Sequence, residues 1–324
     1  MSNTSVGKVD TSKYDNLLKL KKKEKRKADF KRVFPLYLMM LPGMVYLVAN
    51  NYLPMFGILI AFKKVNFSEG ILASPWCGLE NFKFLFATKD AYIMIRNTLL
   101  YNLVWISLGM VISIFIAICM AEISKRPAAK VIQPIICFPS MVSAVILSYI
   151  VYAFLSNSNG FINTTILKDN PISWYMSPKY WPVILTIVHF WQSSGQSSII
   201  YMASIGGIDK SLYESARLDG ATKWQQIKYI TLPLLKPMIM LMLLMSIGRI
   251  FNSDFGMFYQ VPLNSGLLIS TTQTVDTYVY RALLELNNIG MSSAASVFQA
   301  ILGFILVMLS NALVKKVDPE NALF

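Results

Sequence analysis

Six stretches of this chain are apolar over the roughly 20 residues that a helix needs to cross a bilayer. They are Phe34–Phe62, Asn97–Ile123, Ile132–Leu155, Trp181–Ile205, Pro237–Asn252, for which Tyr259 is an alternative end, and Ser293–Val314. A chain of 324 residues of which 55% are apolar has the composition of a polytopic membrane protein. The stretches predict an all-α protein with about six membrane-spanning helices.

The first of these stretches departs from the pattern of a regular helix. It contains Pro42, Pro54 and the adjacent pair Asn50 and Asn51, residues that remove or compete with backbone hydrogen bonds. We therefore expect this helix to kink or to end early. It begins too late and runs too long to be a cleaved signal peptide, so it is expected to act as an uncleaved anchor.

Lysine and arginine are distributed unequally between the segments that connect the apolar stretches. Of the 30 such residues, 21 fall in four segments on one side of the membrane, namely residues 1–33, 124–131, 206–236 and the C-terminal tail. Positive charge is enriched in the cytoplasmic loops of membrane proteins. The distribution predicts a multi-pass plasma-membrane protein with both termini in the cytoplasm, and it explains most of the net charge of +13.

Several function classes are excluded by what the chain lacks. The basic run at residues 19–27 has no interleaved aromatic residues and no nucleic-acid-binding motif, so we expect it to face anionic lipid and not nucleic acid. No hydrolase, metalloprotease or P-loop motif is present, and His189 is the only histidine. We expect no catalytic residue, no metal site and no cofactor bound to this chain.

A strongly polar segment, residues 209–233, lies between the fourth and fifth apolar stretches and is here called the polar hairpin. Its charged side chains on both sides of Gly220 exclude it from the bilayer. Two N-caps are possible for its first helix: Ser211, in a capping box with Glu214, or Asp209 two residues earlier. Gly220 suits a left-handed helix end. The first helix is therefore expected to end at this glycine.

The second half of the polar hairpin carries its own start and stop signals. Thr222 and Gln225 have the spacing of a second capping box. The helix that they open is expected to stop at Pro233, and Pro237 is expected to begin the fifth span as its first helical residue. The polar hairpin is thus predicted to be two short, water-facing helices hinged at a glycine.

The polar hairpin resembles the EAA signature of permease subunits of binding-protein-dependent ABC importers. The matching residues are Glu214, Ser215, Ala216, Asp219, Gly220, Ala221, Ile230, Leu232, Pro233 and Pro237, with Ser215 in place of the usual middle alanine. In that family the loop is a cytoplasmic coupling helix that docks into a groove on an ATPase. The resemblance implies that all of these residues except Ile230 and Pro237 couple the chain to a separate ATPase, which binds ATP and Mg²⁺.

The resemblance also implies the type I importer fold and a place in a larger assembly. Two ATPase subunits present two grooves, so two permease chains are needed, and the nearest relatives use two different ones. We therefore expect a heterodimer with a second permease, two ATPase subunits, and an extracellular solute-binding protein that delivers the cargo. The expected location is the bacterial cell membrane.

Other segments are similar to the sugar permeases of this family. They are GLENF at residues 78–82, the pair Asn97 and Thr98 expected to open the second span, VDTYVY at residues 275–280 and ENALF at residues 320–324. Together with residues 255–264 they look most like a sub-branch that imports complex or uronate-containing oligosaccharides, such as alginate-type systems. An oligosaccharide is accordingly the expected cargo.

These features divide the chain into four parts. Residues 1–33 form a cytoplasmic basic tail, and residues 34–96 form the first span with an extracellular connection. Residues 97–315 form the permease core, which includes the polar hairpin, and residues 316–324 form a cytoplasmic C-terminal tail.

Polar residues within the fourth and fifth spans are the candidates for cargo contacts, because burying a charge in a bilayer is costly. There are two groups: His189, Gln192 and Gln196, which have helical spacing in the fourth span, and Arg249, Asn252 and Asp254, which cluster in the outer half of the fifth. An arginine can hold a uronate carboxylate through two parallel hydrogen bonds. The structural alternatives are an Arg249–Asp254 ion pair and a packing role for His189.

Two other functions fit parts of the pattern. The first is a permease of the same architecture for an amino acid, a peptide or phosphate. The second is a secondary transporter or membrane enzyme, which would need paired carboxylates in the membrane and no ATPase. The predicted spans contain few acidic residues, which disfavours the second alternative.

Overall fold

The computed structural model describes residues 30, 33–66, 68–71, 73–123, 127–285 and 287–317, so the basic run at 19–27 and the ending at 320–324 lie outside the described residues. The chain divides into two compact units, one ending at Ile58 and one beginning at Leu59, and each is described by itself. The regular elements among the described residues are helical, apart from one isolated bridge between Lys63 and Trp76. The predicted all-α class is confirmed.

The first unit consists mainly of the apolar helix Val33–Phe62, whose last residues belong to the second unit. The helix does not end early, so that one of the two alternatives was wrong. The irregularity instead takes the form of a π turn, η1 (Val48–Tyr52), followed by α2 (Leu53–Met55) and the 3₁₀ turn η2 (Phe56–Phe62). The π turn contains the asparagine pair and directly precedes the turn that holds Pro54. A π turn and a proline both interrupt the α-helical hydrogen-bond ladder, so the helix is irregular at these residues.

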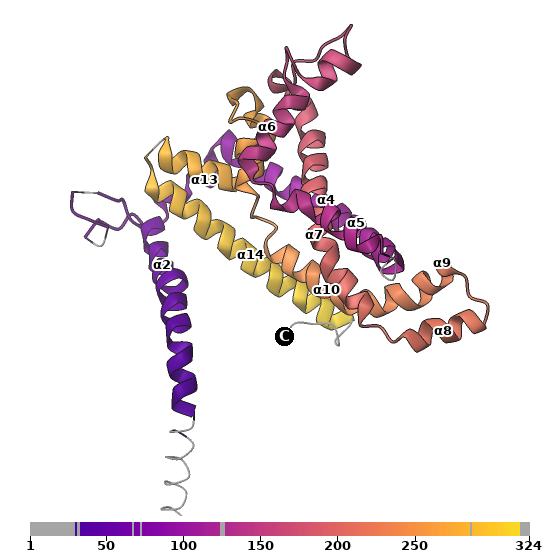
Figure 1. The fold of residues 1–324 in the computed structure, drawn as a ribbon. Helices are drawn as coiled ribbons and strands as arrows, with labels where there is room; N and C mark the ends of the chain where they lie inside the picture. The colour runs from indigo at the N-terminus through magenta and orange to yellow at the C-terminus, as the bar shows by residue number, and fades with distance from the viewer. Residues whose placement is uncertain are drawn as a thin grey trace, which may run out of the picture. The chain divides into compact units, whose positions relative to one another are not determined.

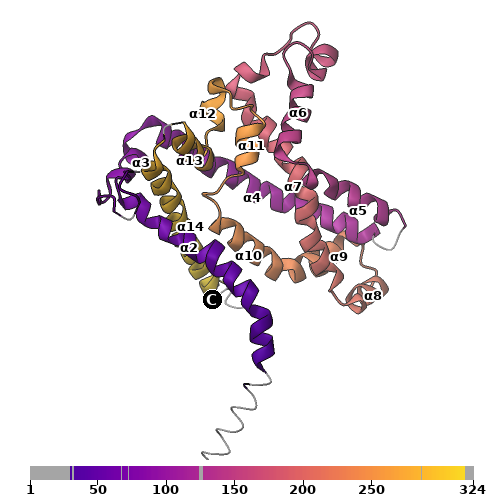
Figure 2. The same cartoon turned by 60° about the vertical axis from the view of Figure 1, so that its left-hand side comes forward.

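The second unit is built from long helices joined by short ones (Figures 1 and 2). The long helices are α4 (Lys89–Ile123), α7 (Trp181–Gly206), α10 (Leu232–Gly248) and α14 (Ile289–Val317). The short ones are α3 (Phe84–Ala87), α5 (Ala129–Cys137), α6 (Ala144–Leu155), α8 (Lys210–Leu218), α9 (Lys223–Gln226), α11 (Phe255–Gln260), α12 (Ile269–Thr272) and α13 (Val275–Leu284). Single turns are η3 (Glu80–Phe82), η4 (Phe138–Met141), η5 (Ile162–Ile166), η6 (Trp174–Met176), η7 (Pro178–Tyr180), η8 (Ile227–Thr231) and η9 (Gly266–Leu268).

Helices that can cross a membrane occupy the predicted positions. In the described part of the chain, 4 helices are long and apolar enough: Val33–Phe62, Lys89–Ile123, Lys223–Gly248 and Ile289–Lys316. A fifth span results if the bent pair Ala129–Met141 and Ala144–Leu155 counts as one. The remaining predicted span corresponds to α7, which has 26 residues but is less apolar because serines and glutamines interrupt it.

The third predicted span is not one straight helix. Its two parts, Ala129–Met141 and Ala144–Leu155, meet at an angle of 97°. Val142 and Ser143 have extended backbone, and the Ser143 side chain accepts a hydrogen bond from the Ile146 N–H as the N-cap of α6. The expectation of a continuous span was wrong. It arose because the apolar pattern is uninterrupted on both sides of this bend and so gives no sign of it.

The fifth span begins inside the polar hairpin and not at Pro237. Helix α9, the π turn η8 and α10 form one continuous helix, Lys223–Gly248. Pro233 lies in the first turn after η8, where the change in hydrogen-bond register tolerates a residue without an N–H, and Pro237 lies inside α10. The predicted stop at Pro233 and start at Pro237 were therefore both wrong.

Close helix packing in the second unit depends on small residues. Helix α4 lies along α7, and α14 packs on α10 and α13. A Cβ added to Gly303 on α14 would lie 2.7 Å from the Gly248 carbonyl oxygen on α10. Only a glycine lets the two backbones approach this closely, as is common between membrane helices.

One face of α4 holds the irregular backbone on either side of α11 and α12. Asn97 Nδ2 donates to the carbonyls of Ser270 and Gln273 at 3.2 and 3.0 Å, and the Thr98 hydroxyl accepts from the Val275 N–H at 3.0 Å. Buried backbone groups need such partners, because an unpaired polar group away from water is costly. The Asn97–Thr98 pair does not open the helix, because α4 begins at Lys89. The pair lies within α4 and anchors the backbone of a different segment.

Candidate functional site

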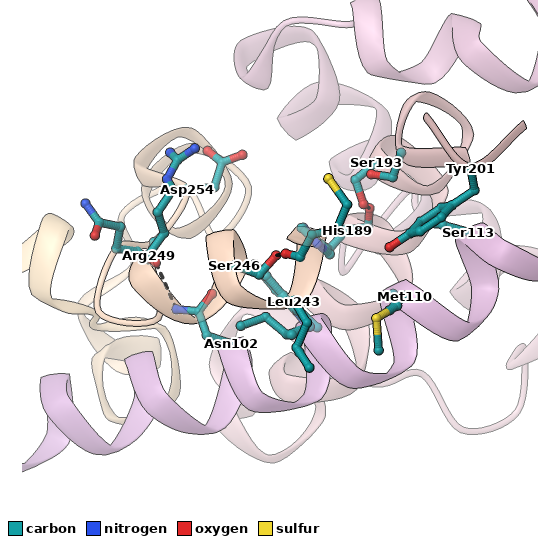
Figure 3. Close-up of a pocket in the computed structure, with 17 residues that line it drawn as sticks. Asn102, Met110, Ser113, His189, Ser193, Tyr201, Leu243, Ser246, Arg249 and Asp254 are labelled. Carbon is teal, nitrogen blue, oxygen red and sulfur yellow. Dashed lines mark hydrogen bonds between the residues drawn. The ribbon is translucent and has the colours of Figure 1, made fainter. Parts of the chain in front are cut away.

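A cavity of about 520 Å³ lies between α4, α7, α10 and the segment 249–254 (Figure 3). Its lining residues are Asn102, Trp105, Ile106, Gly109, Met110, Ser113, His189, Ser193, Ser197, Tyr201, Met242, Leu243, Ser246, Arg249, Asn252, Ser253 and Asp254. Its volume falls within the range of ligand pockets in proteins. Most of the polar groups are hydroxyls and amides, the groups that hydrogen-bond sugar hydroxyls.

The helices contribute to the cavity along rows of residues four apart. On α7 this row is His189, Ser193, Ser197 and Tyr201. The Ser193 hydroxyl donates to the His189 carbonyl at 2.7 Å, and the Ser246 hydroxyl on α10 donates to the Met242 carbonyl at 2.8 Å. Each of these two serine hydroxyls donates to a carbonyl of its own helix, so no donor is left unpaired. The oxygen lone pairs remain available to a ligand, and the cavity walls are polar and lined by small side chains.

A cation and an anion lie at the same end of the cavity. Figure 3 shows Arg249 and Asp254 there, at the opposite end from Tyr201 and Ser113. The Asp254 carboxylate accepts from the Met257 N–H at 3.1 Å and caps α11. Among the described residues the Arg249 guanidinium has no ion-pair or hydrogen-bond partner, so the expected alternative of an Arg249–Asp254 pair was wrong. The aspartate stabilises the helix start, and the arginine remains free for a ligand.

An aromatic stack supports the middle of the cavity. The His189 and Trp105 rings are stacked, with centroids 3.7 Å apart and planes 7° apart. Phe258 covers Trp105 at 5.2 Å, and Trp105 Nε1 donates to the Thr186 hydroxyl at 3.2 Å. Trp105 is buried, so it acts as the support on which His189 rests. The predicted packing role for His189 therefore coexists with its position on the cavity wall.

Two of the predicted cargo residues do not line this cavity. Gln192 Nε2 donates to the Val142 carbonyl at 3.0 Å and so holds the bend between α5 and α6. Gln196 is exposed elsewhere on α7. The prediction placed residues three and four apart on one face of α7. The cavity instead follows residues four apart, and such a row turns gradually around the helix axis. His189, Arg249, Asn252 and Asp254 do line the cavity, as their spacing suggested.

Other lining residues were missed from the sequence. Asn102 on α4 donates to the carbonyls of Ile250 and Asn252, both at 2.8 Å, and so fixes the segment that carries Arg249. Ser193, Ser197 and Tyr201 follow His189 at intervals of four. This interval is visible in the sequence and would have predicted three of the missed residues.

The polar hairpin forms the second candidate site. Its first helix, α8, is capped by Asp209, whose carboxylate accepts from the Ser211 N–H at 3.0 Å, so the capping box at Ser211 and Glu214 was the wrong alternative. This backbone hydrogen bond lowers the pKa of Asp209 below its ordinary value. Thr222 and Gln225 form the predicted second capping box. Both caps are built from local contacts, so spacing identifies the second cap and leaves two alternatives for the first.

The turn between the two helices is a Schellman motif centred on Gly220. The Ala221 N–H donates to the Ala216 carbonyl at 2.8 Å and the Gly220 N–H donates to the Arg217 carbonyl at 3.1 Å. Gly220 has a φ of +79°, which confirms the predicted left-handed helix end. Side chains other than glycine are strained in this conformation, so the angle between α8 and α9 depends on this residue.

The polar hairpin exposes apolar side chains as well as charges. Leu218 is 90% exposed and Trp224 is 70% exposed. Of the residues expected to couple to an ATPase, Glu214, Ser215, Asp219, Gly220 and Pro233 are exposed, and Ala216, Ala221 and Leu232 are half-buried. Exposed large apolar residues with a polar rim are typical of a protein-binding surface. The coupling roles of the individual residues remain predictions.

Comparison with known proteins places this geometry in a family. Residues 109–320 match the family described as "Binding-protein-dependent transport system inner membrane component". The polygalacturonan/rhamnogalacturonan transport system permease protein YteP of Bacillus subtilis (strain 168) is 34% identical over 310 residues, which are 93% of this chain and 94% of that protein. Protein LplB of the same organism is 30% identical over 296 residues, 91% of this chain and 92% of that protein.

A solved structure shows the same architecture. The structure of a bacterial ABC transporter involved in the import of the acidic polysaccharide alginate matches with a TM-score of 0.81 and 29% identity, over 91% of this chain and 99% of that chain. A second structure, of a bacterial alginate ABC transporter in complex with alginate pentasaccharide-bound periplasmic protein, matches with a TM-score of 0.79. The family match covers more than half of the chain, and the relatives agree with it along nearly the whole length. The chain belongs to the family of inner membrane components of binding-protein-dependent transport systems, as a permease subunit of an ABC importer.

Proposed function

We propose that this permease forms half of a translocation pathway for an acidic oligosaccharide, one that contains uronate residues. The observation that carries the proposal is Arg249, a cation at the end of a polar cavity that has no protein partner among the described residues. An unpaired guanidinium is a ready donor for a carboxylate, which it can bind through two hydrogen bonds. The hydroxyls of Ser193, Ser197 and Ser246 suit the neutral part of a sugar chain.

Similar proteins support an acidic cargo. The relative YteP is named for polygalacturonan and rhamnogalacturonan transport, and the solved transporter imports the acidic polysaccharide alginate. These cargoes are chains of sugars with carboxylates. The free arginine of this chain matches the feature that they share, whereas an importer for amino acids or phosphate would need no room for a row of sugar hydroxyls.

The polar hairpin is proposed to dock on a separate ATPase. Leu218 and Trp224 supply an apolar contact, and the charged residues around Gly220 supply a polar rim. Interfaces combine these two elements. The ATPase would bind ATP and Mg²⁺, and this chain would convert the movement of the docked hairpin into movement of its membrane helices.

The remaining partners and the orientation follow from the same proposal. A second, different permease would complete the pathway, two ATPase subunits would each take one polar hairpin, and an extracellular binding protein would deliver the oligosaccharide. The polar hairpin and both termini would lie in the cytoplasm of a bacterial cell, as the distribution of lysine and arginine favours.

Uptake in proteoliposomes tests the proposal. The complete importer would be reconstituted and supplied with oligogalacturonate, a neutral oligosaccharide of equal length, an amino acid, a peptide or phosphate. We expect ATP-dependent uptake of the uronate oligosaccharide above all others. Uptake of an amino acid, a peptide or phosphate instead would support the alternative permease, and uptake without the ATPase would support a secondary transporter.

A further inference from the structure

Two side-chain pairs hold the polar hairpin: one ties it to α4, and the other ties its first helix, α8, to the π turn that continues into α10. Glu122, the penultimate residue of α4, pairs with Lys223, the first residue of α9. The Tyr213 hydroxyl on α8 hydrogen-bonds the Thr231 hydroxyl of η8 at 2.9 Å. Both pairs join positions far apart in the sequence, 101 residues in the first case and 18 in the second.

The Glu122–Lys223 pair is the single ion pair found in the described part of the chain. Both side chains are more than half exposed, at 60% and 54%, so water screens their attraction and the pair adds little to folding stability. Its position is what distinguishes it. Helix α4 also carries Trp105 and Ser113 on the cavity wall, so this pair joins the polar hairpin to one side of the cavity.

The Tyr213–Thr231 pair joins α8 to the helix that forms another side of the cavity. Thr231 is buried and lies in the π turn between α9 and α10, and its hydroxyl also bonds the Gln226 carbonyl at 3.5 Å. Helix α10 continues from this turn to Ser246 and Arg249 on the cavity wall. Single π turns inside α-helices occur frequently at functional sites. The tyrosine therefore joins α8 to the point where the fifth span is least regular.

We propose that Glu122, Lys223, Tyr213 and Thr231 are positioning residues that transmit movement of the polar hairpin to the cavity. The inference rests on the proposed docking of the hairpin on an ATPase. The Glu122–Lys223 pair moves α4 with the hairpin. The Tyr213–Thr231 pair moves α8 together with the continuous helix that runs through Thr231 into α10. A displacement of the docked hairpin then changes both walls of the cavity together, as rigid-body movement of helices requires.

An exposed lysine on a docking hairpin has a competing partner, an acidic residue of the ATPase. A charge exchange within this chain distinguishes pairing of Lys223 with Glu122 from pairing with an acidic residue of the ATPase. Lys223→Glu removes both interactions, whereas Lys223→Glu combined with Glu122→Lys restores only the pair inside the permease. Lys228→Glu, which changes an exposed charge on the same helix and has no partner on α4, is the matched control.

The experiment uses the complete importer in proteoliposomes and measures cargo transported per ATP hydrolysed. We expect each single variant, Lys223→Glu and Glu122→Lys, to lower this ratio by about twofold to fivefold, the range for one exposed ion pair. We expect the double variant to recover the wild-type ratio. A double variant no better than the singles, with ATPase binding intact, overturns the inference.

Conservative variants test the second pair by the same ratio. Tyr213→Phe removes only the bond to Thr231, whereas Thr231→Val also removes the bond to the Gln226 carbonyl. Because the Tyr213–Thr231 bond is already absent from Thr231→Val, the double variant is expected to lower the ratio no further than Thr231→Val alone. Additive losses would contradict a shared role. Tyr92→Phe, which removes an exposed hydroxyl on α4, is the control. Failure of the proposed docking would give a different result from failure of this inference, because the ATPase would then not bind the wild-type permease at all.

Discussion

His189 and Trp105 face each other across the α4–α7 contact with their rings nearly parallel, at a centroid distance of 3.7 Å and an interplanar angle of 7°. Trp105 is thereby enclosed between His189 and Phe258, and its indole N–H is bonded to Thr186. The one histidine of the chain is held on the cavity wall by its stacking on Trp105. The geometry of the cavity thus depends on a buried tryptophan of α4.

Replacing Trp105 by alanine is expected to destabilise the permease strongly. Removal of a buried tryptophan costs about 3–5 kcal/mol of unfolding free energy. Trp105→Phe keeps a ring beneath His189 and is expected to cost less. The measurement is the half-life of the folded protein at raised temperature in detergent. Trp191→Ala, at a tryptophan of α7 that is about half exposed, is the control, and an equal loss there would contradict a specific role for the stack.

Arg249 is expected to set the preference for an acidic cargo. Arg249→Ala removes a charge-assisted hydrogen bond, which is worth about 1.5–3 kcal/mol, or roughly a tenfold to hundredfold loss of affinity. Uptake of a uronate oligosaccharide should fall by this factor, and uptake of a neutral oligosaccharide should change little. Arg249→Lys should lose less, because it keeps the charge but not the planar fork. Equal losses for both cargoes would show that the arginine is structural.

Asn97 is expected to be essential for the segment between α12 and α13. Asn97→Leu leaves the carbonyl of Gln273 without its donor in a buried site, at a cost of about 1–3 kcal/mol, whereas the Ser270 carbonyl keeps its hydrogen bond from Arg96. The melting temperature in detergent should fall accordingly. Asn170→Leu, at an exposed loop position, is the control. An unchanged melting temperature for Asn97→Leu would mean that water reaches the Gln273 carbonyl.

Gly220 is expected to be needed for coupling and not for folding. At a φ of +79° a β-branched side chain is strained by about 1 kcal/mol or more, so Gly220→Val should change the angle between α8 and α9. ATPase stimulation should be lost while the amount of folded permease is unchanged. Gly57→Val, at a glycine with open space around it and an ordinary backbone conformation, is the control. Full stimulation of the Gly220→Val variant would contradict the proposed role of the turn.

Local signals predicted local structure well. The capping box at Thr222 and Gln225 and the left-handed Gly220 were both predictable, because each depends only on residues within one helical turn. The long apolar stretches also predicted the spans, since the bilayer fixes their length. The choice between Asp209 and Ser211 could not be made, because both residues satisfy the same local rule.

Features that depend on tertiary contacts were not predictable in the same way. The bend at Val142 is held by Gln192, a residue 50 positions away, so Gln192 is not available to the cavity. The continuous helix through Pro233 depends on a π turn, which leaves no clear mark in the sequence. Arg249, Asn252 and Asp254 were singled out because they cluster just beyond an apolar run, and all three line the cavity. Their contact with cargo remains a prediction.

The most direct test of the account is a cross-link between the polar hairpin and an ATPase. Leu218, which is 90% exposed, would be changed to cysteine after Cys77, Cys119 and Cys137 are replaced by serine. A cysteine at Met176, an exposed residue of η6, is the control. We expect the ATPase to capture Leu218→Cys in intact membranes and not to capture Met176→Cys. Capture from the Met176 position alone, or labelling of Leu218→Cys by a reagent that cannot cross the membrane, would contradict this expectation.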